Sequence, residues 1–129
     1  MSLSIVIFVP EFMTLKDIRA RLAGSYSLSK DEDLSEVEEL NVGHNDGRPI
    51  CVIKYPIGTL NGILQRRGID ASKLRGFWLD FCRVPAVNDV IKGIVTPNSW
   101  VLTTEETPIT GLEFVARVES DPAWNPYGW

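Results

Sequence analysis

The chain has few of the side chains on which most catalytic and metal sites depend. It contains one histidine, His44, and two cysteines, Cys51 and Cys82. A structural zinc site needs four cysteine or histidine ligands in closely spaced pairs, so no metal site is expected. No G-x-S-x-G motif supplies a serine nucleophile, and both cysteines lie in strand-like runs that do not lower a thiol pKa. We therefore expect a non-enzymatic protein without a cofactor, and an enzyme of unknown class ranks last among three hypotheses.

Glycine-rich phosphate loops and a positive net charge are also absent. Neither G-x-G-x-x-G nor G-x-x-x-x-G-K-[ST] occurs, so nucleotide binding of those kinds is not indicated. The formal net charge of -4 and the isoelectric point near 5.0 argue against nucleic acid as the main partner. The apolar run at residues 4–9 stops at Pro10 and is too short to cross a membrane. Two cysteines in apolar stretches fit a reducing compartment, so we expect a cytoplasmic protein without a membrane partner.

The negative charge is concentrated in one short run of the sequence. This acidic run consists of Asp31, Glu32, Asp33, Glu36, Glu38 and Glu39. Such a run is typical of a solvated helix or loop face. It also suits an interface, because concentrated charge speeds encounter with a partner of opposite charge and rejects wrong partners. The leading hypothesis is a non-enzymatic binding protein whose acidic surface engages a basic protein partner, as an immunity protein or inhibitor does.

A cluster of basic residues gives the acidic run an alternative role. The cluster consists of Arg66, Arg67, Lys73 and Arg75. Arginines in the last turn of a helix are explained by the helix dipole alone. The cluster is also suited to meet the acidic run of the same or a neighbouring subunit, which would make both of them a device for self-association.

Residues 76–84 alternate between two faces, and a carboxylate interrupts the second face. That face carries Trp78, Asp80 and Cys82. A carboxylate beside an aromatic wall suits a cationic or polar small ligand. The second hypothesis is therefore a small-molecule-binding domain with a pocket near Trp78 and Asp80. If the face is solvated, Asp80 is only the polar half of an alternating strand.

Hydrophobic periodicity and turn residues predict an alternation of strands and helices through most of the chain. Thr14 and Asp17 have the spacing of a capping box, which predicts where the first helix begins. The sequence H-N-D-G at residues 44–47 predicts the turn of a hairpin. The predicted elements are a strand at 4–9, a helix at 15–22, a helical turn at 30–36, hairpin strands at 37–43 and 49–55, a helix ending at Gly68, a turn from Asp70, a strand at 76–84 and a helix at 85–95.

Two further alternating runs, residues 99–106 and 111–119, predict a C-terminal β-hairpin around residues 107–110. In the last run, the residues expected to face the core are Leu112, Phe114, Ala116 and Val118. The whole pattern predicts a single α+β domain over residues 1–121 with a mixed or antiparallel sheet. The order βαββαβ in its first part is that of a ferredoxin-like fold, extended here by a helix and the hairpin.

Residues 122–129 carry three large aromatic side chains, Trp124, Tyr127 and Trp129. Chain ends that do not pack gain nothing from such rings. Burying the three together removes enough apolar surface to exceed the entropy cost of ordering the segment, whereas burying one ring does not. We therefore expect this aromatic tail to dock on the domain or on a neighbouring subunit, as in a homodimer, and a partner-binding peptide is the alternative.

Overall fold

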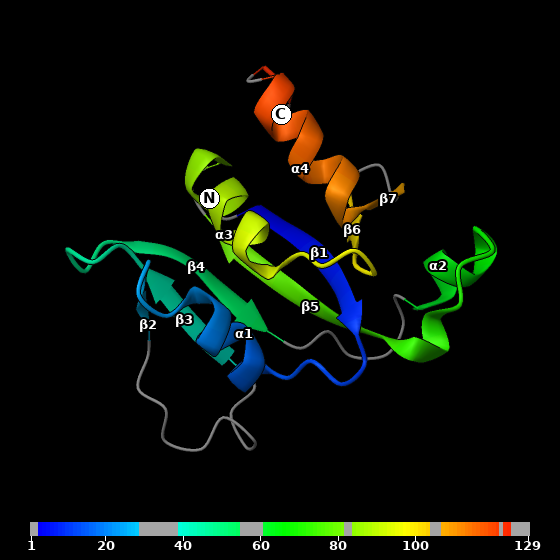
Figure 1. The fold of residues 1–129 in the computed structure, drawn as a ribbon, viewed down its shortest axis with the longest axis horizontal. Coiled ribbons are helices and arrows are strands. Elements are labelled where there is room, and N and C mark those ends of the chain that lie inside the picture. Colours follow the sequence, from blue (N-terminus) through cyan, green and yellow to red (C-terminus); the bar gives the residue numbers. More distant parts are fainter. Residues whose placement is uncertain are drawn as a thin grey trace.

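One antiparallel sheet of seven strands forms the framework of the protein. Figure 1 shows its strands with the helices packed around them. The computed structural model describes residues 3–28, 39–54, 61–81, 84–103, 107–121 and 123–124. The strands are β1 (Leu3–Pro10), β2 (Ser27–Leu28), β3 (Glu39–Gly43), β4 (Pro49–Lys54), β5 (Leu74–Phe81), β6 (Trp100–Leu102) and β7 (Pro108–Thr110). The helices are α1 (Leu15–Leu22), α2 (Asn61–Arg66), the short 3-10 helix η1 (Ala71–Lys73), α3 (Val84–Ile94) and α4 (Gly111–Ser120). The prediction of an α+β fold with an antiparallel sheet is confirmed.

The order of strands across the sheet is β2-β3-β4-β5-β1-β6-β7. β1 lies between β5 and β6 and pairs antiparallel with both. The ferredoxin-like arrangement is not confirmed. Its split βαβ units place another strand between the two strands that a helix connects, whereas α2 connects β4 to β5, and these two strands are direct antiparallel neighbours. The order of elements along the chain therefore did not determine their order across the sheet.

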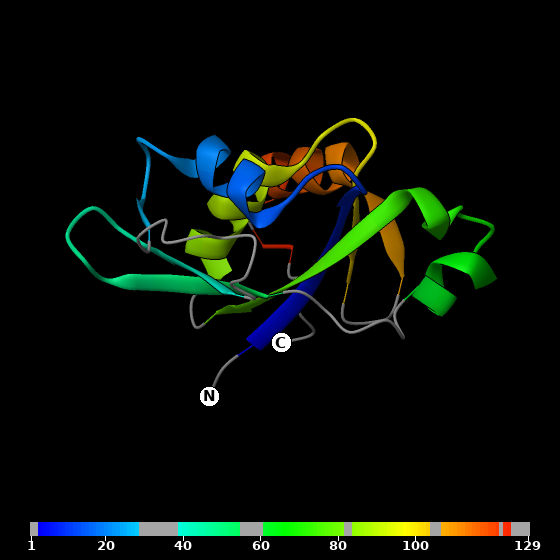
Figure 2. The same cartoon turned by 90° about the horizontal axis from the view of Figure 1, so that it is seen from below.

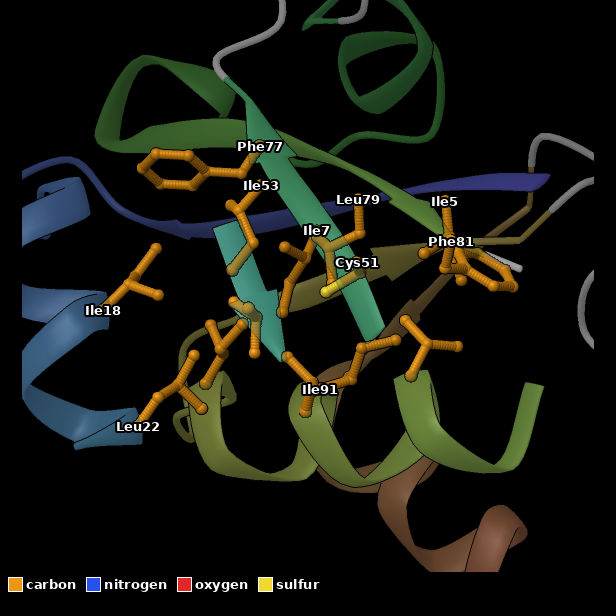
Figure 3. Close-up of a cluster of buried hydrophobic side chains, with 14 of the residues drawn as sticks. Ile5, Ile7, Ile18, Leu22, Cys51, Ile53, Phe77, Leu79, Phe81 and Ile91 are labelled. Atoms are coloured by element: carbon orange, nitrogen blue, oxygen red, sulfur yellow. The ribbon is translucent and has the colours of Figure 1, made fainter. Parts of the chain in front are cut away.

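Three helices, α1, α3 and α4, cover one face of the sheet (Figure 2). Alternate residues of the strands point to this face, so that Ile7 lies opposite Phe77 and Ile53 lies opposite Leu79. All four side chains are fully buried. Figure 3 shows this layer of strand side chains above α3, with Ile91 directed toward it. The main core thus fills the space between the sheet and these helices.

The opposite face of the sheet carries a second, smaller core beside α2 and η1. Trp78 is partly buried at the margin of this cluster. The turn predicted from Asp70 is present, because the Asp70 carboxylate accepts a hydrogen bond from the backbone N–H of Ser72 at 3.0 Å. The buried members of the second core are Val6, Phe8, Leu64, Ala71 and Leu102.

Helix α1 begins at the predicted capping box. The Thr14 hydroxyl accepts a hydrogen bond from the backbone N–H of Asp17 at 3.2 Å, and the Asp17 carboxylate accepts one from the backbone N–H of Thr14 at 2.8 Å. The end of the helix approaches α3 closely, since a Cβ atom on Gly93 would lie 2.9 Å from the Leu22 side chain. Arg21 then donates a hydrogen bond to the Gly93 carbonyl at 3.1 Å. Glycine at this position lets the two helices pack together.

A C-terminal hairpin is present, but it differs from the predicted one: β6 pairs with β7, whose residues 108–110 were predicted to form the turn. The prediction of a strand at residues 111–119 is wrong, because these residues belong to α4. The Thr110 hydroxyl caps the helix by accepting a hydrogen bond from the backbone N–H of Glu113 at 3.1 Å. Phe114 is buried as expected, whereas Leu112, which was expected to face the core, is 56% exposed. Helical capping and spacing therefore override an alternation that also fits a strand.

Trp124 packs against α4. Its ring lies 5.5 Å from the Phe114 ring in an edge-on arrangement, and the Arg117 guanidinium lies 5.5 Å from the ring centroid. Both geometries are favourable for aromatic and cation–π contacts. Tyr127 and Trp129 lie outside the described residues, so docking of the whole aromatic tail stays a prediction.

Candidate ligand pocket

The hairpin of β3 and β4 extends past the end of the neighbouring strand β5. Pairing between β4 and β5 ends where Cys51 lies opposite Phe81, the last residue of β5. Among the described residues, the two preceding residues of β4, Pro49 and Ile50, have no partner on β5. A shift of register after Val42 bends the hairpin at the same level. The end of the hairpin thus overhangs the sheet.

The turn of the hairpin is held by a short set of hydrogen bonds. The backbone N–H of His44 donates to the Arg48 carbonyl at 2.7 Å, and Gly47 has a positive φ of 89°, which favours glycine. The Asp46 carboxylate accepts hydrogen bonds from the Arg48 backbone N–H at 3.1 Å and from its Nε at 2.7 Å. The backbone N–H of Arg48 is the main group that lowers the pKa of Asp46. The predicted turn is confirmed.

A pocket of about 460 Å³ lies where the hairpin overhangs the sheet. We call it the hairpin pocket. It is bounded by the hairpin, the end of β5 and the first turn of α3. Its volume lies within the range of roughly 300–1,000 Å³ that is typical of small-molecule sites. The residues that line it are Asn41, Val42, His44, Arg48, Pro49, Ile50, Cys51, Val52, Asp80, Phe81 and Ala86.

Cys51 lies in the wall of the hairpin pocket but is 5% exposed. Figure 3 shows its side chain within the buried layer that includes Leu79 and Phe81. Burial raises the pKa of the Cys51 thiol to about 12, and the negative charge of Asp80 adds a smaller contribution in the same direction. The thiol is therefore protonated at neutral pH and is a poor nucleophile. In this pocket Cys51 acts as an apolar wall.

Asp80 is the acidic group of the pocket. It lies opposite Val52 on β4, and its carboxylate forms an ion pair with the Lys54 ammonium at 3.2 Å. The two side chains are 39% and 40% exposed, so water weakens the attraction between them. Asp80 is therefore a half-exposed carboxylate whose charge is partly balanced by a neighbouring lysine.

The three residues predicted for a ligand site do not lie together in one described site. Asp80 lines the hairpin pocket, as the second hypothesis requires of its acidic residue. Trp78 belongs to the margin of the second core and is not among the described residues that line the pocket. Cys82 lies outside the described residues, so its position relative to Cys51 is not established.

The acidic run is described only at its C-terminal end. Glu39 is exposed at the start of β3, where it lies opposite Lys54 in the register. The other five acidic residues, Asp31, Glu32, Asp33, Glu36 and Glu38, lie outside the described residues. An interface for a basic partner therefore stays a prediction.

A second hollow, of about 330 Å³, lies beside the loop between β1 and α1. Phe12 in this loop is 77% exposed. The hollow is more open than the hairpin pocket and has fewer apolar residues in its walls. The residues that line it are Pro10, Glu11, Phe12, Lys73, Leu74 and Asn98. The hairpin pocket is the better candidate for a ligand site.

Comparisons with protein-family models, curated proteins and solved structures find no significant match to this chain. In the part of the chain that the structure describes, no group of three or more histidine, cysteine or acidic side chains is placed to hold a metal ion. None of the described helices is long and apolar enough to cross a membrane. The interpretation of the hairpin pocket therefore depends on its own geometry.

Several residues of the pocket were not predicted as site residues. The sequence predicts His44 and Arg48 only as part of a turn, and Ala86 only as part of the helix at 85–95. Their common location depends on the overhang of β4 past β5, which is a long-range feature of the sheet. The one local signal was the turn sequence H-N-D-G, which places His44 and Arg48 opposite each other.

Proposed function

We propose that this chain is a small-molecule-binding domain whose ligand occupies the hairpin pocket. One observation carries the proposal: a pocket of about 460 Å³ combines mainly apolar walls with a few polar side chains. Ligand sites in proteins have this composition, because apolar walls supply affinity and a few polar groups fix the orientation of the ligand. The presence of Asp80 in the lining adds support, since the second hypothesis required an apolar pocket that contains this residue.

The polar groups of the pocket favour binding over catalysis. The raised pKa of Cys51 keeps its thiol protonated, so Cys51 and His44 do not form an activated pair. Asp80 is engaged by Lys54 at 3.2 Å rather than presented alone in an apolar site. Both features suit groups that recognise a ligand.

The proposal is tested with an apolar fluorescent probe, N-phenylnaphthylamine, which brightens when it leaves water. We expect saturable binding at one site per chain and a rise in melting temperature with probe concentration. A ligand at about a hundred times its dissociation constant stabilises the native state by about 2.7 kcal/mol. The absence of saturable binding, together with an unchanged melting temperature, would reject the proposal.

A pocket-filling variant assigns this binding to the hairpin pocket. Ala86 lines the pocket from α3 and is half-buried, so Ala86→Phe places a ring in the cavity. The matched control is Ala20→Phe, at an exposed position of α1. We expect probe affinity to fall at least about tenfold in the first variant, a loss of about 1.4 kcal/mol, and to be unchanged in the second. Val52→Trp fills the pocket from β4 and replaces Ala86→Phe if that variant does not fold.

An acidic interface for a basic protein remains a separate proposal. It is supported by the concentration of acidic residues at 31–39 and by the exposure of Glu39, where the run enters the sheet. Reversal of Glu36, Glu38 and Glu39 to lysine would abolish a salt-sensitive complex of this kind while leaving the fold intact. Retention of the complex by the folded variant would exclude it.

A further inference from the structure

The polar groups of the hairpin pocket are divided between its two ends. His44 and Arg48 lie at the turn, whereas Asp80 lies on β5 opposite Val52. Three residue steps along the chain separate His44 from Asn41, which lies opposite Val52, so these ends are about 10 Å apart at roughly 3.3 Å per residue. Hydrogen-bond donors therefore gather at one end and a carboxylate lies at the other, with apolar walls between them.

We propose that the ligand of the hairpin pocket is an amphipathic organic acid. Its acidic group binds Arg48 and His44 at the turn, and its apolar body lies along Ile50 and Cys51. This inference rests on the proposed function and goes beyond it by naming the chemical class of the ligand. The distance of about 10 Å between the polar ends corresponds to an apolar body about as long as three residues of extended chain.

The Arg48 guanidinium has hydrogen-bond donors that are available to an acidic group of a ligand. Asp46 accepts hydrogen bonds from the Arg48 backbone N–H and from its Nε. No described residue accepts a hydrogen bond from the two terminal nitrogens of the guanidinium, and these nitrogens form the fork that binds a carboxylate through two parallel hydrogen bonds. The Arg48 side chain is 66% exposed, so a ligand can reach it. Asp46 thus orients the guanidinium without occupying its fork.

His44 adds a second polar group on the same face of the hairpin. Its backbone N–H donates to the Arg48 carbonyl at 2.7 Å, so the two residues lie directly opposite each other. Side chains of residues that oppose each other in an antiparallel pair share one face. His44 and Arg48 are both among the residues that line the pocket, which is consistent with this placement.

Asp80 determines the orientation of the bound ligand. Its carboxylate repels an acidic group from the β5 end of the pocket, and an unfavourable contact of this kind contributes to specificity. A cationic group at that end would have to compete with Lys54, which already lies 3.2 Å from Asp80. Both effects favour an acid whose charged group is held at the turn.

The affinity of the hairpin pocket for an acidic group depends on hydrogen bonds more than on the net charge of the site. Asp46 lies 2.7 Å from Arg48 and offsets most of its charge at a distance. Long-range attraction is therefore small, while the donors of the guanidinium still act at contact. We expect binding of an acid to change little with salt concentration, unlike binding to an uncompensated cluster of arginines.

The test compares three ligands that share one apolar chain: octanoate, octanol and octylamine. Each is titrated against N-phenylnaphthylamine bound to the full chain, and the concentration that displaces half of the probe is measured. We expect octanoate to displace the probe at a concentration about tenfold lower than octanol does. In Arg48→Gln this preference should disappear while octanol is unaffected. The matched control, Arg67→Gln, removes the same charge from an exposed position after α2 and should keep the preference.

The outcomes separate the two proposals. Equal displacement by octanoate and octanol, or a preference that survives Arg48→Gln, overturns the organic-acid inference while the ligand pocket stands. A preference for octylamine also overturns it and assigns the site to a cationic ligand at Asp80. Failure of the probe to bind at all rejects the proposed function and, with it, this inference.

Discussion

At the scale of single residues, burial decides what Cys51 can do. His44 and Cys51 both line the hairpin pocket, and their residue types are those of a cysteine–histidine catalytic pair. The thiol is 5% exposed and lies near the carboxylate of Asp80. Both features disfavour a thiolate, so its pKa is raised rather than lowered. The sequence supplied the residue types, whereas their chemistry depends on a long-range environment.

The raised pKa of Cys51 predicts a loss of stability at alkaline pH. In the unfolded chain the thiol has an ordinary pKa near 9.0, whereas in the folded chain it keeps its proton up to about pH 12. The unfolded state therefore binds fewer protons between these values, and the free energy of unfolding falls as pH rises through this window. Three units correspond to on the order of 4 kcal/mol by the upper end of the window.

This prediction is checked by urea unfolding at a series of pH values from neutral to alkaline. Cys51→Val, which keeps the apolar volume, should show a shallower decline than the wild-type chain. Burial also raises the pKa of Tyr26, with the same sign of effect, so Tyr26→Phe serves as a separate control. Identical profiles for wild type and Cys51→Val would contradict the assigned role of the thiol.

At the scale of elements, the sequence predicted correctly those features that depend on a few neighbouring residues. The capping box of α1 and the turn between β3 and β4 each lie within a few residues, and both are confirmed. Residues 111–119 fit both the alternation of a strand and the spacing of a helix. Leu112 and Phe114 alternate as in a strand, while Phe114 and Val118 have helical spacing. The decisive signal was Thr110 with Glu113, a helix start like that of Thr14 with Asp17.

Because Thr110 caps α4, its hydroxyl should contribute to the stability of the whole domain. Thr110→Ala removes the acceptor of the bond from the Glu113 backbone N–H at 3.1 Å. We expect a loss of about 1 kcal/mol in the free energy of unfolding. Thr110→Ser keeps the hydroxyl and should restore most of it, and Ser120→Ala at the exposed end of α4 should change little. A loss in Thr110→Ser as large as in Thr110→Ala would show that the hydroxyl does not cap the helix.

At the scale of the whole molecule, the arrangement of the strands is what the sequence left open. The element types predicted an α+β fold, but the position of β5 between β4 and β1 depends on pairings between distant parts of the chain. The hairpin pocket is a consequence of that position, because it forms where β4 extends past the end of β5. Asp80 was predicted from a local interruption of a strand, whereas His44, Arg48 and Ala86 join it only through this topology.

The aromatic tail provides the last prediction, which concerns the molecule or its assembly as a whole. Trp124 contacts Phe114 and Arg117 on α4, so Trp124→Ala should cost about 1–2 kcal/mol, since the ring is only partly buried. If the tail docks as a unit, a chain that ends at Asp121 should melt at a clearly lower temperature than Trp124→Ala does. Equal melting temperatures would mean that Tyr127 and Trp129 do not hold the fold. Docking on the parent domain gives a melting temperature independent of protein concentration, whereas docking on a neighbouring subunit makes it rise with concentration.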